Sequence, residues 1–227
     1  MPPFFRHVWT IAAKDLRSEL RTKETLNAAV SFSVAILLLF SFAFDPATEE
    51  AREMLGGLLW IVFLFAATLV LNRSFAREIP NDCLDVLLAS PASSAAIFLG
   101  KAIASFCMIL IVELVCVPVF GLFYNIRMFD QPFWFLAIAS LTTWAMTIIG
   151  ATFSALTVNL RLRELMLPVL IYPMLIPPLM GAFYLTGILL SGNAIQSADL
   201  LWLRLLIGFD IIFTALALAM VDAVLVN

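Results

Sequence analysis

Six long apolar runs constrain the fold of this chain more than any other feature of its sequence. They cover residues 26–44, 54–72, 102–124, 133–158, 165–190 and 204–226. A helix needs about 20 mostly apolar residues to cross a bilayer. The six runs take up most of the 227 residues, and only 13% of the chain is charged, so no room is left for a separate soluble domain. The sequence therefore predicts an all-α polytopic membrane protein with a single transmembrane domain over residues 1–227.

The basic residues are unevenly divided between the two sides of the membrane. Five lie in residues 1–25, three in residues 72–101 and two in the loop after the fourth run, all on one side if each run crosses once. The other side has only Arg52, Arg127 and Arg204. We expect a multi-pass protein of the cell membrane. Because cytoplasmic loops carry an excess of Lys and Arg, both termini should be cytoplasmic, and the acidic loop 45–53 should be external.

Residues 1–25 do not form a signal peptide, since they carry eight charges and no small-residue cleavage site follows the first apolar run. Apolar residues recur there every three or four positions, at Phe5, Val8, Trp9, Ala12, Leu16 and Leu20. This spacing predicts an amphipathic helix in the cytoplasmic interface, with Trp9 at headgroup depth. An ordinary basic tail that only sets the topology is the alternative.

The charged segment 72–101 separates the second and third apolar runs. It cannot lie in hydrocarbon because it holds six charged residues, namely Arg73, Arg77, Glu78, Asp82, Asp85 and Lys101. Its middle is also helix-prone, with Leu84, Leu87 and Leu88 at helical spacing. The pattern predicts a short cytoplasmic surface helix whose apolar face meets the bilayer or a partner.

Two acidic residues fall inside apolar runs. Glu113 is near the middle of the third run, where an ionised carboxylate costs about 3 kcal/mol or more unless it is paired, hydrated or protonated. Its candidate partners are the hydroxyls of the fourth run, at Thr142, Thr143 and Thr147. Glu113 is either a residue of a substrate path or gate, or a protonated tie between two helices. For Asp210 we expect a pair with Arg204 at the outer interface.

The fifth run contains four prolines, Pro168, Pro173, Pro177 and Pro178. Each proline removes a backbone donor and crowds the preceding turn. We therefore expect a broken helix at Pro173, Pro177 and Pro178, with 179–190 re-entering from the outer side. A single kinked helix is the alternative. A broken helix must be covered by protein or water, which favours a two-fold homodimer.

The sequence contains no motif for catalysis, metal binding or nucleotide binding. There is no P-loop, no H-E-x-x-H and no G-x-S-x-G. The only histidine is His7, and the three cysteines, at positions 83, 107 and 116, lack zinc spacing. We expect no catalytic residues, no metal site and no nucleic-acid partner. Any work that the protein performs must be driven by a partner.

Six spans with an interfacial N-terminal helix and a large first cytoplasmic loop resemble the permease subunits of ABC-2-type exporters. Within the loop, the order and spacing of motifs resemble the heme exporter protein B family of the cytochrome c maturation system. These motifs are Leu71-Asn72-Arg73-Ser74-Phe75, Glu78, Leu84-Asp85, Leu87-Leu88, Ser90-Pro91 and Ile97-Phe98-Leu99-Gly100-Lys101. Elsewhere the resemblance rests on topology, size and the proline-rich fifth span. Family members commonly place charged residues after Ser-Pro, where this chain has Ala92-Ser93-Ser94.

The resemblance implies a transporter subunit without a catalytic site of its own, acting in the assembly of c-type cytochromes. A separate cytoplasmic ATPase subunit would bind ATP and dock under the charged segment 72–101, which would couple the two subunits. A second membrane protein would handle heme, together with a heme chaperone on the outer side. The sequence itself adds that the only histidine, His7, is expected inside and offers no outer-face imidazole for heme iron, so we expect this chain to bind no cofactor and to act mechanically. The expected coupling residues are Arg73, Arg77, Glu78, Asp82, Leu84, Asp85, Leu87 and Leu88.

Two other functions are compatible with the same topology. An ABC-2 permease could export a lipid, a polysaccharide or a drug, and it would differ only in the loop motif. A membrane scaffold without transport activity, or an intramembrane enzyme, would be favoured if no ATPase co-purified with the chain.

Overall fold

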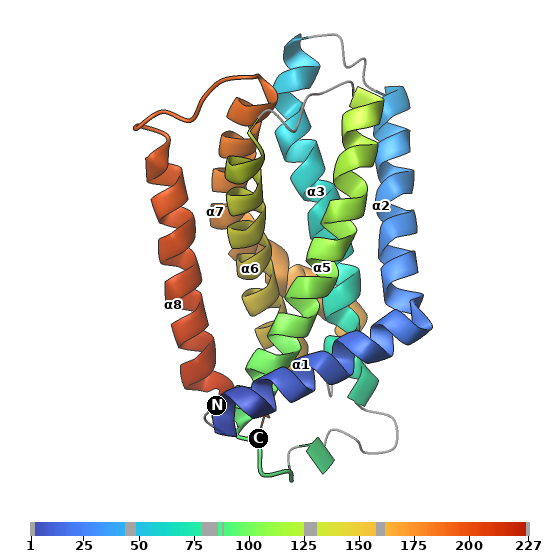
Figure 1. The fold of residues 1–227 in the computed structure, drawn as a ribbon, viewed down its shortest axis with the longest axis vertical. Helices are drawn as coiled ribbons and strands as arrows, with labels where there is room; N and C mark the ends of the chain where they lie inside the picture. Colours follow the sequence, from blue (N-terminus) through green and yellow to red (C-terminus); the bar gives the residue numbers. More distant parts are fainter. Residues whose placement is uncertain are drawn as a thin grey trace.

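The computed structural model describes residues 3–43, 49–78, 86–87, 89–124, 131–157 and 162–225. The long helices of this part are α1 (Pro3–Thr22), α2 (Glu24–Ala43), α3 (Glu49–Ser74), α5 (Ser94–Tyr124), α6 (Pro132–Thr157), α7 (Arg163–Leu190) and α8 (Leu200–Leu225), with the 3-10 helix η1 at Ala76–Glu78. Six of them, α2 to α8, are long and apolar enough to cross a membrane. This confirms the all-α polytopic fold. Helix α1 lies across one end of the bundle, where α8 also ends (Figure 1), and we call this the α1 end.

Helix α3 occupies the centre of the bundle. It packs against α2, α5, α6 and α7. In its most apolar stretch of 18 residues, 67% is buried, against 22% in the corresponding stretches of α2 and α8. Trp60 is fully buried there, and its indole Nε1 donates to Thr186 Oγ1 of α7 at 2.9 Å. One turn earlier, a Cβ on Gly56 would lie only 3.0 Å from the backbone of Gly187 and Phe183. The missing side chain therefore lets α3 and α7 cross in direct backbone contact.

The chain turns sharply between α1 and α2. Lys23 has φ 58°, a left-handed conformation that L residues adopt only rarely. This one residue ends α1 at Thr22 and starts the upright α2 at Glu24. As a result α1 lies flat against the bundle instead of continuing into the first membrane span.

Helix α1 forms as expected, but its apolar residues divide between two surroundings. Val8, Ile11 and Ala12 are buried, and α1 packs so closely on α5 that a Cβ on Gly100 would lie 2.8 Å from the Ile11 side chain. Trp9 stays exposed, as do Phe5 and Leu20. Only this second set is free to meet a membrane surface, and its depth in a bilayer stays a prediction.

The expected break in the fifth span is wrong. Helix α7 is continuous from Arg163 to Leu190 with all four prolines inside it, so residues 179–190 complete the span and do not re-enter. The helix changes direction along its length (Figure 1), as proline-containing helices do. Its contacts with α3, α6 and α8 support the turns that lack a backbone hydrogen bond.

Candidate functional site

Lys101 is a fully buried lysine of α5 near the α1 end. Its Nζ donates to Glu78 Oε1 at 3.0 Å, to Asp15 Oδ2 at 3.3 Å and to the Ser74 carbonyl oxygen at 3.1 Å. It also lies 5.2 Å from the centre of the Phe75 ring. A buried ammonium is tolerated when its charge is compensated and its donors are used. Lys101 therefore connects α5 both to α1 and to the end of α3.

The two ends of the segment 72–101 belong to long helices, and its position relative to the membrane face stays a prediction. Helix α3 continues to Ser74, and α5 already begins at Ser94. Lys101 thus lies two turns inside a helix, with no exposed surface. Its partners are 23 and 86 residues away along the chain, so the spacing of charges in the segment could not reveal them.

Lys14 is a second cation in the same cluster. Its Nζ lies 2.6 Å from Glu78 Oε1 and 3.2 Å from Asp15 Oδ1. Partial burial opposes its charge, but the hydrogen bond to Glu78 and the negative charge of Asp15 outweigh burial and raise the pKa of Lys14. Two lysines therefore face two carboxylates, and their formal charges balance.

Glu19 closes the corner between α1 and α2. Its carboxyl group is fully buried, and Oε1 accepts the backbone N–H groups of Thr25 at 2.8 Å and Leu26 at 2.9 Å. Its Oε2 accepts from Arg77, whose guanidinium also donates to Thr25 Oγ1 at 2.5 Å. Burial alone would raise its pKa, but the bonds from Leu26 and Arg77 outweigh burial and hold the pKa of Glu19 below its usual range. The same carboxylate thus caps α2 and pairs with the end of α3.

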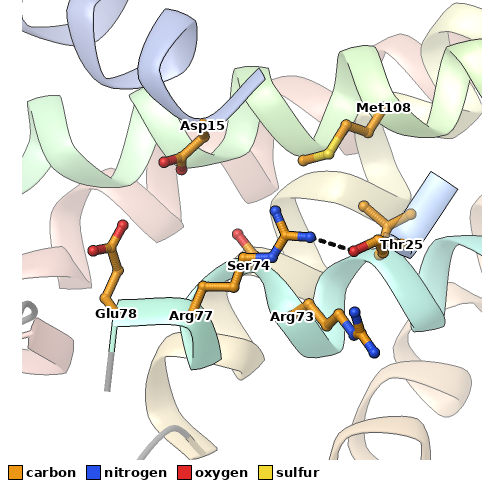
Figure 2. Close-up of a pocket in the computed structure, with 8 residues that line it drawn as sticks. Asp15, Thr25, Arg73, Ser74, Arg77, Glu78 and Met108 are labelled. Carbon is orange, nitrogen blue, oxygen red and sulfur yellow. Dashed lines mark hydrogen bonds between the residues drawn. The ribbon is translucent and has the colours of Figure 1, made fainter. Parts of the chain in front are cut away.

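These contacts form one polar junction, which we define as Lys14, Asp15, Glu19, Thr25, Ser74, Arg77, Glu78 and Lys101. Figure 2 labels five of its members, Asp15, Thr25, Ser74, Arg77 and Glu78, around a small cavity, with Arg77 reaching toward Thr25. The cavity has a volume of about 20 Å³, which is room for about one water molecule. The polar junction is therefore too tight to hold a substrate and serves to join helices.

Sequence reasoning identified Arg77, Glu78 and Lys101 but missed the contribution of α1. Asp15 and Glu19 counted there only as charges of an amphipathic helix. Glu19 lies inside α1, four positions before Lys23, whereas a typical N-terminal cap is the residue that immediately precedes the helix, so the local sequence did not point to its capping role. No local signal announces Asp15, whose partner lies in α5.

Of the other predicted coupling residues, the structure describes Arg73 and Leu87. Arg73 is exposed and lies 3.3 Å from Glu24 Oε2, outside the polar junction. Leu87 has helical backbone, and its carbonyl accepts the N–H of Ser90 at 3.2 Å. Four predicted coupling residues lie outside the described residues, namely Asp82, Leu84, Asp85 and Leu88.

Glu113 is buried in α5, and one predicted partner is confirmed. Thr143 Oγ1 of α6 donates to its Oε1 at 2.5 Å. The Thr147 hydroxyl donates instead to the Thr143 carbonyl oxygen at 2.7 Å. Within the described residues, Glu113 Oε2 and Thr142 Oγ1 have no hydrogen-bond partner. Glu113 therefore links α5 to α6 through one oxygen only.

Asp210 does not form the expected pair with Arg204. Asp210 is buried in α8 and Arg204 is exposed. The two are six positions apart on one helix, which places them on different faces, because a helix has 3.6 residues per turn. Neither carboxyl oxygen of Asp210 has a hydrogen-bond partner in the part of the chain that the structure describes.

Potential metal ligands among the described residues do not gather in space. Among the residues described, no three His, Cys, Asp or Glu side chains come close enough together to hold a metal ion. Cys107 and Cys116 are both free thiols of α5, and Cys83 lies outside the described residues.

Comparison with known proteins gives a consistent result. A family model described as CcmB protein matches residues 6–227. The relatives include proteins named heme exporter protein B from Rhodobacter capsulatus, 27% identical over 75% of this chain and 78% of the relative, and from Paracoccus denitrificans, 29% identical over 74% and 76%. A third, from Pseudomonas aeruginosa, is 29% identical over 88% of both chains.

Proposed function

Because the chain belongs to the CcmB protein family, we propose that it is the membrane subunit of a heme exporter, driven by a separate ATPase. The observation that carries this proposal is the family match over nearly the whole chain, which agrees with the names of the relatives. ATP is bound and hydrolysed on the partner, and heme is the cargo of the complex in the assembly of c-type cytochromes. A second, heme-handling membrane protein completes the exporter complex.

The polar junction supports a mechanical role for the segment that follows Glu78. That segment begins after η1, which ends at Glu78, and is followed by α5, which begins at Ser94. Glu78 and Lys101, near its two ends, are held together at 3.0 Å, and Asp15 adds α1 to the pair. A displacement of the segment by a docked ATPase is therefore applied to α1, α3 and α5 together. Transmission of this kind requires a rigid connection, which buried ion pairs provide.

Leu87 offers a direct test of docking. The substitution Leu87→Asp places a charge at the apolar centre of the proposed contact, so it should reduce the amount of ATPase that co-purifies by about tenfold or more. Membrane insertion should be unchanged. The matched control is Ser191→Asp, which adds the same charge at an exposed position at the far end of α7. Full ATPase binding by Leu87→Asp would reject the docking role of this segment.

The orientation of the bundle is a second part of the proposal. The α1 end faces the cytoplasm, since most of the basic residues of the chain lie in segments at that end. In a background without cysteines, a cysteine introduced by Glu49→Cys should react with an impermeant thiol reagent added to intact cells. Reaction only after permeabilisation would show that the bundle has the opposite orientation.

A two-fold homodimer, with one ATPase below each copy, also stays part of the proposal. The fifth span does not favour a dimer, because α7 is continuous. The native mass of the complex extracted in mild detergent tests it, and an active complex with one copy of this chain would contradict it.

A further inference from the structure

A cavity of about 360 Å³ lies between the second half of α5 and the first half of α6, away from the α1 end. Its volume is within the range of small-molecule sites. Apart from Glu113 its walls are apolar, and they include Leu110, Val117, Pro132, Phe135 and Ala139. Two further wall residues, Leu114 and Leu136, are largely exposed on the outer surface of the bundle. An apolar molecule dissolved in the bilayer therefore has access to the cavity.

Glu113 gives this apolar cavity one polar group. The residue is 4% exposed, and Thr143 occupies its Oε1, whereas Oε2 has no partner in the described residues. A buried polar atom without a partner is uncommon and costs free energy. Oε2 has almost no surface open to the cavity, so the carboxyl group must turn before a ligand can hydrogen-bond to Oε2 and remove this cost.

The chemistry of Glu113 defines the polar group of such a ligand. An ionised carboxylate needs a hydrogen-bond donor, and a protonated one can also donate from Oε2. A hydroxyl group satisfies both states because it is donor and acceptor at once. The described walls offer no cation for a phosphate or a carboxylate, so a charged lipid headgroup does not fit.

We propose that this cavity binds a membrane-soluble alcohol or phenol, with its apolar body between α5 and α6 and its hydroxyl on Glu113. The proposal goes beyond heme export and does not rest on it. Two sources share this chemistry: a hydroxyl-bearing lipid such as a diacylglycerol, and an isoprenoid quinol.

The test measures binding to the purified full-length chain in detergent by native mass spectrometry. The probes are dioleoylglycerol and a decyl-tailed ubiquinol, each beside its O-methylated derivative, which cannot donate. At least one hydroxyl probe should bind about tenfold or more tightly than its ether, the factor expected for a hydrogen bond to a carboxyl group. The probe that shows the larger ratio identifies the source. Equal binding of hydroxyl and ether, or no binding of either probe, would overturn the proposal without the need for any variant.

Variants then locate the site. Glu113→Leu should abolish the difference between hydroxyl and ether, and Ala139→Phe should reduce binding of both by filling the cavity. Asp210→Leu is the matched control, since it removes the other buried acid of the membrane spans and should leave the ratio unchanged. A preserved ratio in Glu113→Leu would contradict the assignment. So would a disulfide between two copies through Leu136→Cys, because a second chain would then cover the opening.

Discussion

The polar junction and the two buried acids of the membrane spans, Glu113 and Asp210, contain similar side chains in very different surroundings. In the junction, Glu19 and Glu78 each meet a cation and at least one further donor. In the spans, Glu113 meets a single hydroxyl, and Asp210 has no partner among the described residues. The comparison separates two uses of buried charge. Paired charges join helices, and unpaired ones reduce stability and are kept for another reason.

The largest expected effect comes from Lys101→Met. It leaves Glu78 and Asp15 with one half-exposed cation, and breaking a buried ion pair costs about 3–5 kcal/mol. The measurement is the free energy of unfolding in mixed micelles, titrated with a denaturing detergent. Lys14→Met is the control, because this lysine is half exposed and its loss should cost about 1 kcal/mol or less. Equal losses in the free energy of unfolding for Lys101→Met and Lys14→Met would show that the buried and the half-exposed lysine contribute equally to stability.

Glu19→Gln should have the next largest effect, about 1–2 kcal/mol, since it weakens the cap of α2 and leaves Arg77 without its carboxylate. The folded pKa of Glu19 lies below its ordinary value of 4.5. Its stabilising contribution is therefore complete above pH 4.5 and is lost as the pH falls through the folded pKa. Unfolding measured between pH 7 and pH 3 should show a steeper acid loss for the wild type than for Glu19→Gln. Parallel curves would contradict this, and Glu24→Gln, at an exposed ion pair, serves as control.

Asp210→Leu should change stability in the opposite direction. Removing a buried carboxyl group without a partner should raise the free energy of unfolding by about 1 kcal/mol. The control is Asp222→Leu, an exposed acid on the same helix, for which no gain is expected. A loss of stability in Asp210→Leu would show that Asp210 has a stabilising partner.

Glu113→Gln should have the smallest effect, below about 0.5 kcal/mol, because the amide oxygen can still accept from Thr143 at the same place. The same unfolding measurement checks it, with Thr143→Val as the variant that removes the bond. A large loss in Glu113→Gln would mean that the negative charge itself stabilises the fold.

The sequence was sufficient for those features that depend on local composition. The six spans follow from the length of the apolar runs, and α1 follows from its helical spacing. The position of Lys101 could not be predicted, since its burial depends on Asp15 in another helix. The sequence overstated the effect of the prolines on the continuity of α7, because packing against neighbouring helices supports a bent but continuous helix.

The corner between α1 and α2, at the left-handed residue Lys23, can form before the rest of the polar junction during synthesis. The bonds that Glu19 makes to the start of α2 join residues six and seven positions apart, so this corner can form as soon as α2 has been made. The bond from Arg77 must wait for α3, and those from Lys101 must wait for α5. Contacts of short separation form first because they close the smallest loops. The polar junction is therefore completed in steps, and its last ion pairs form only when the third span has joined the first two.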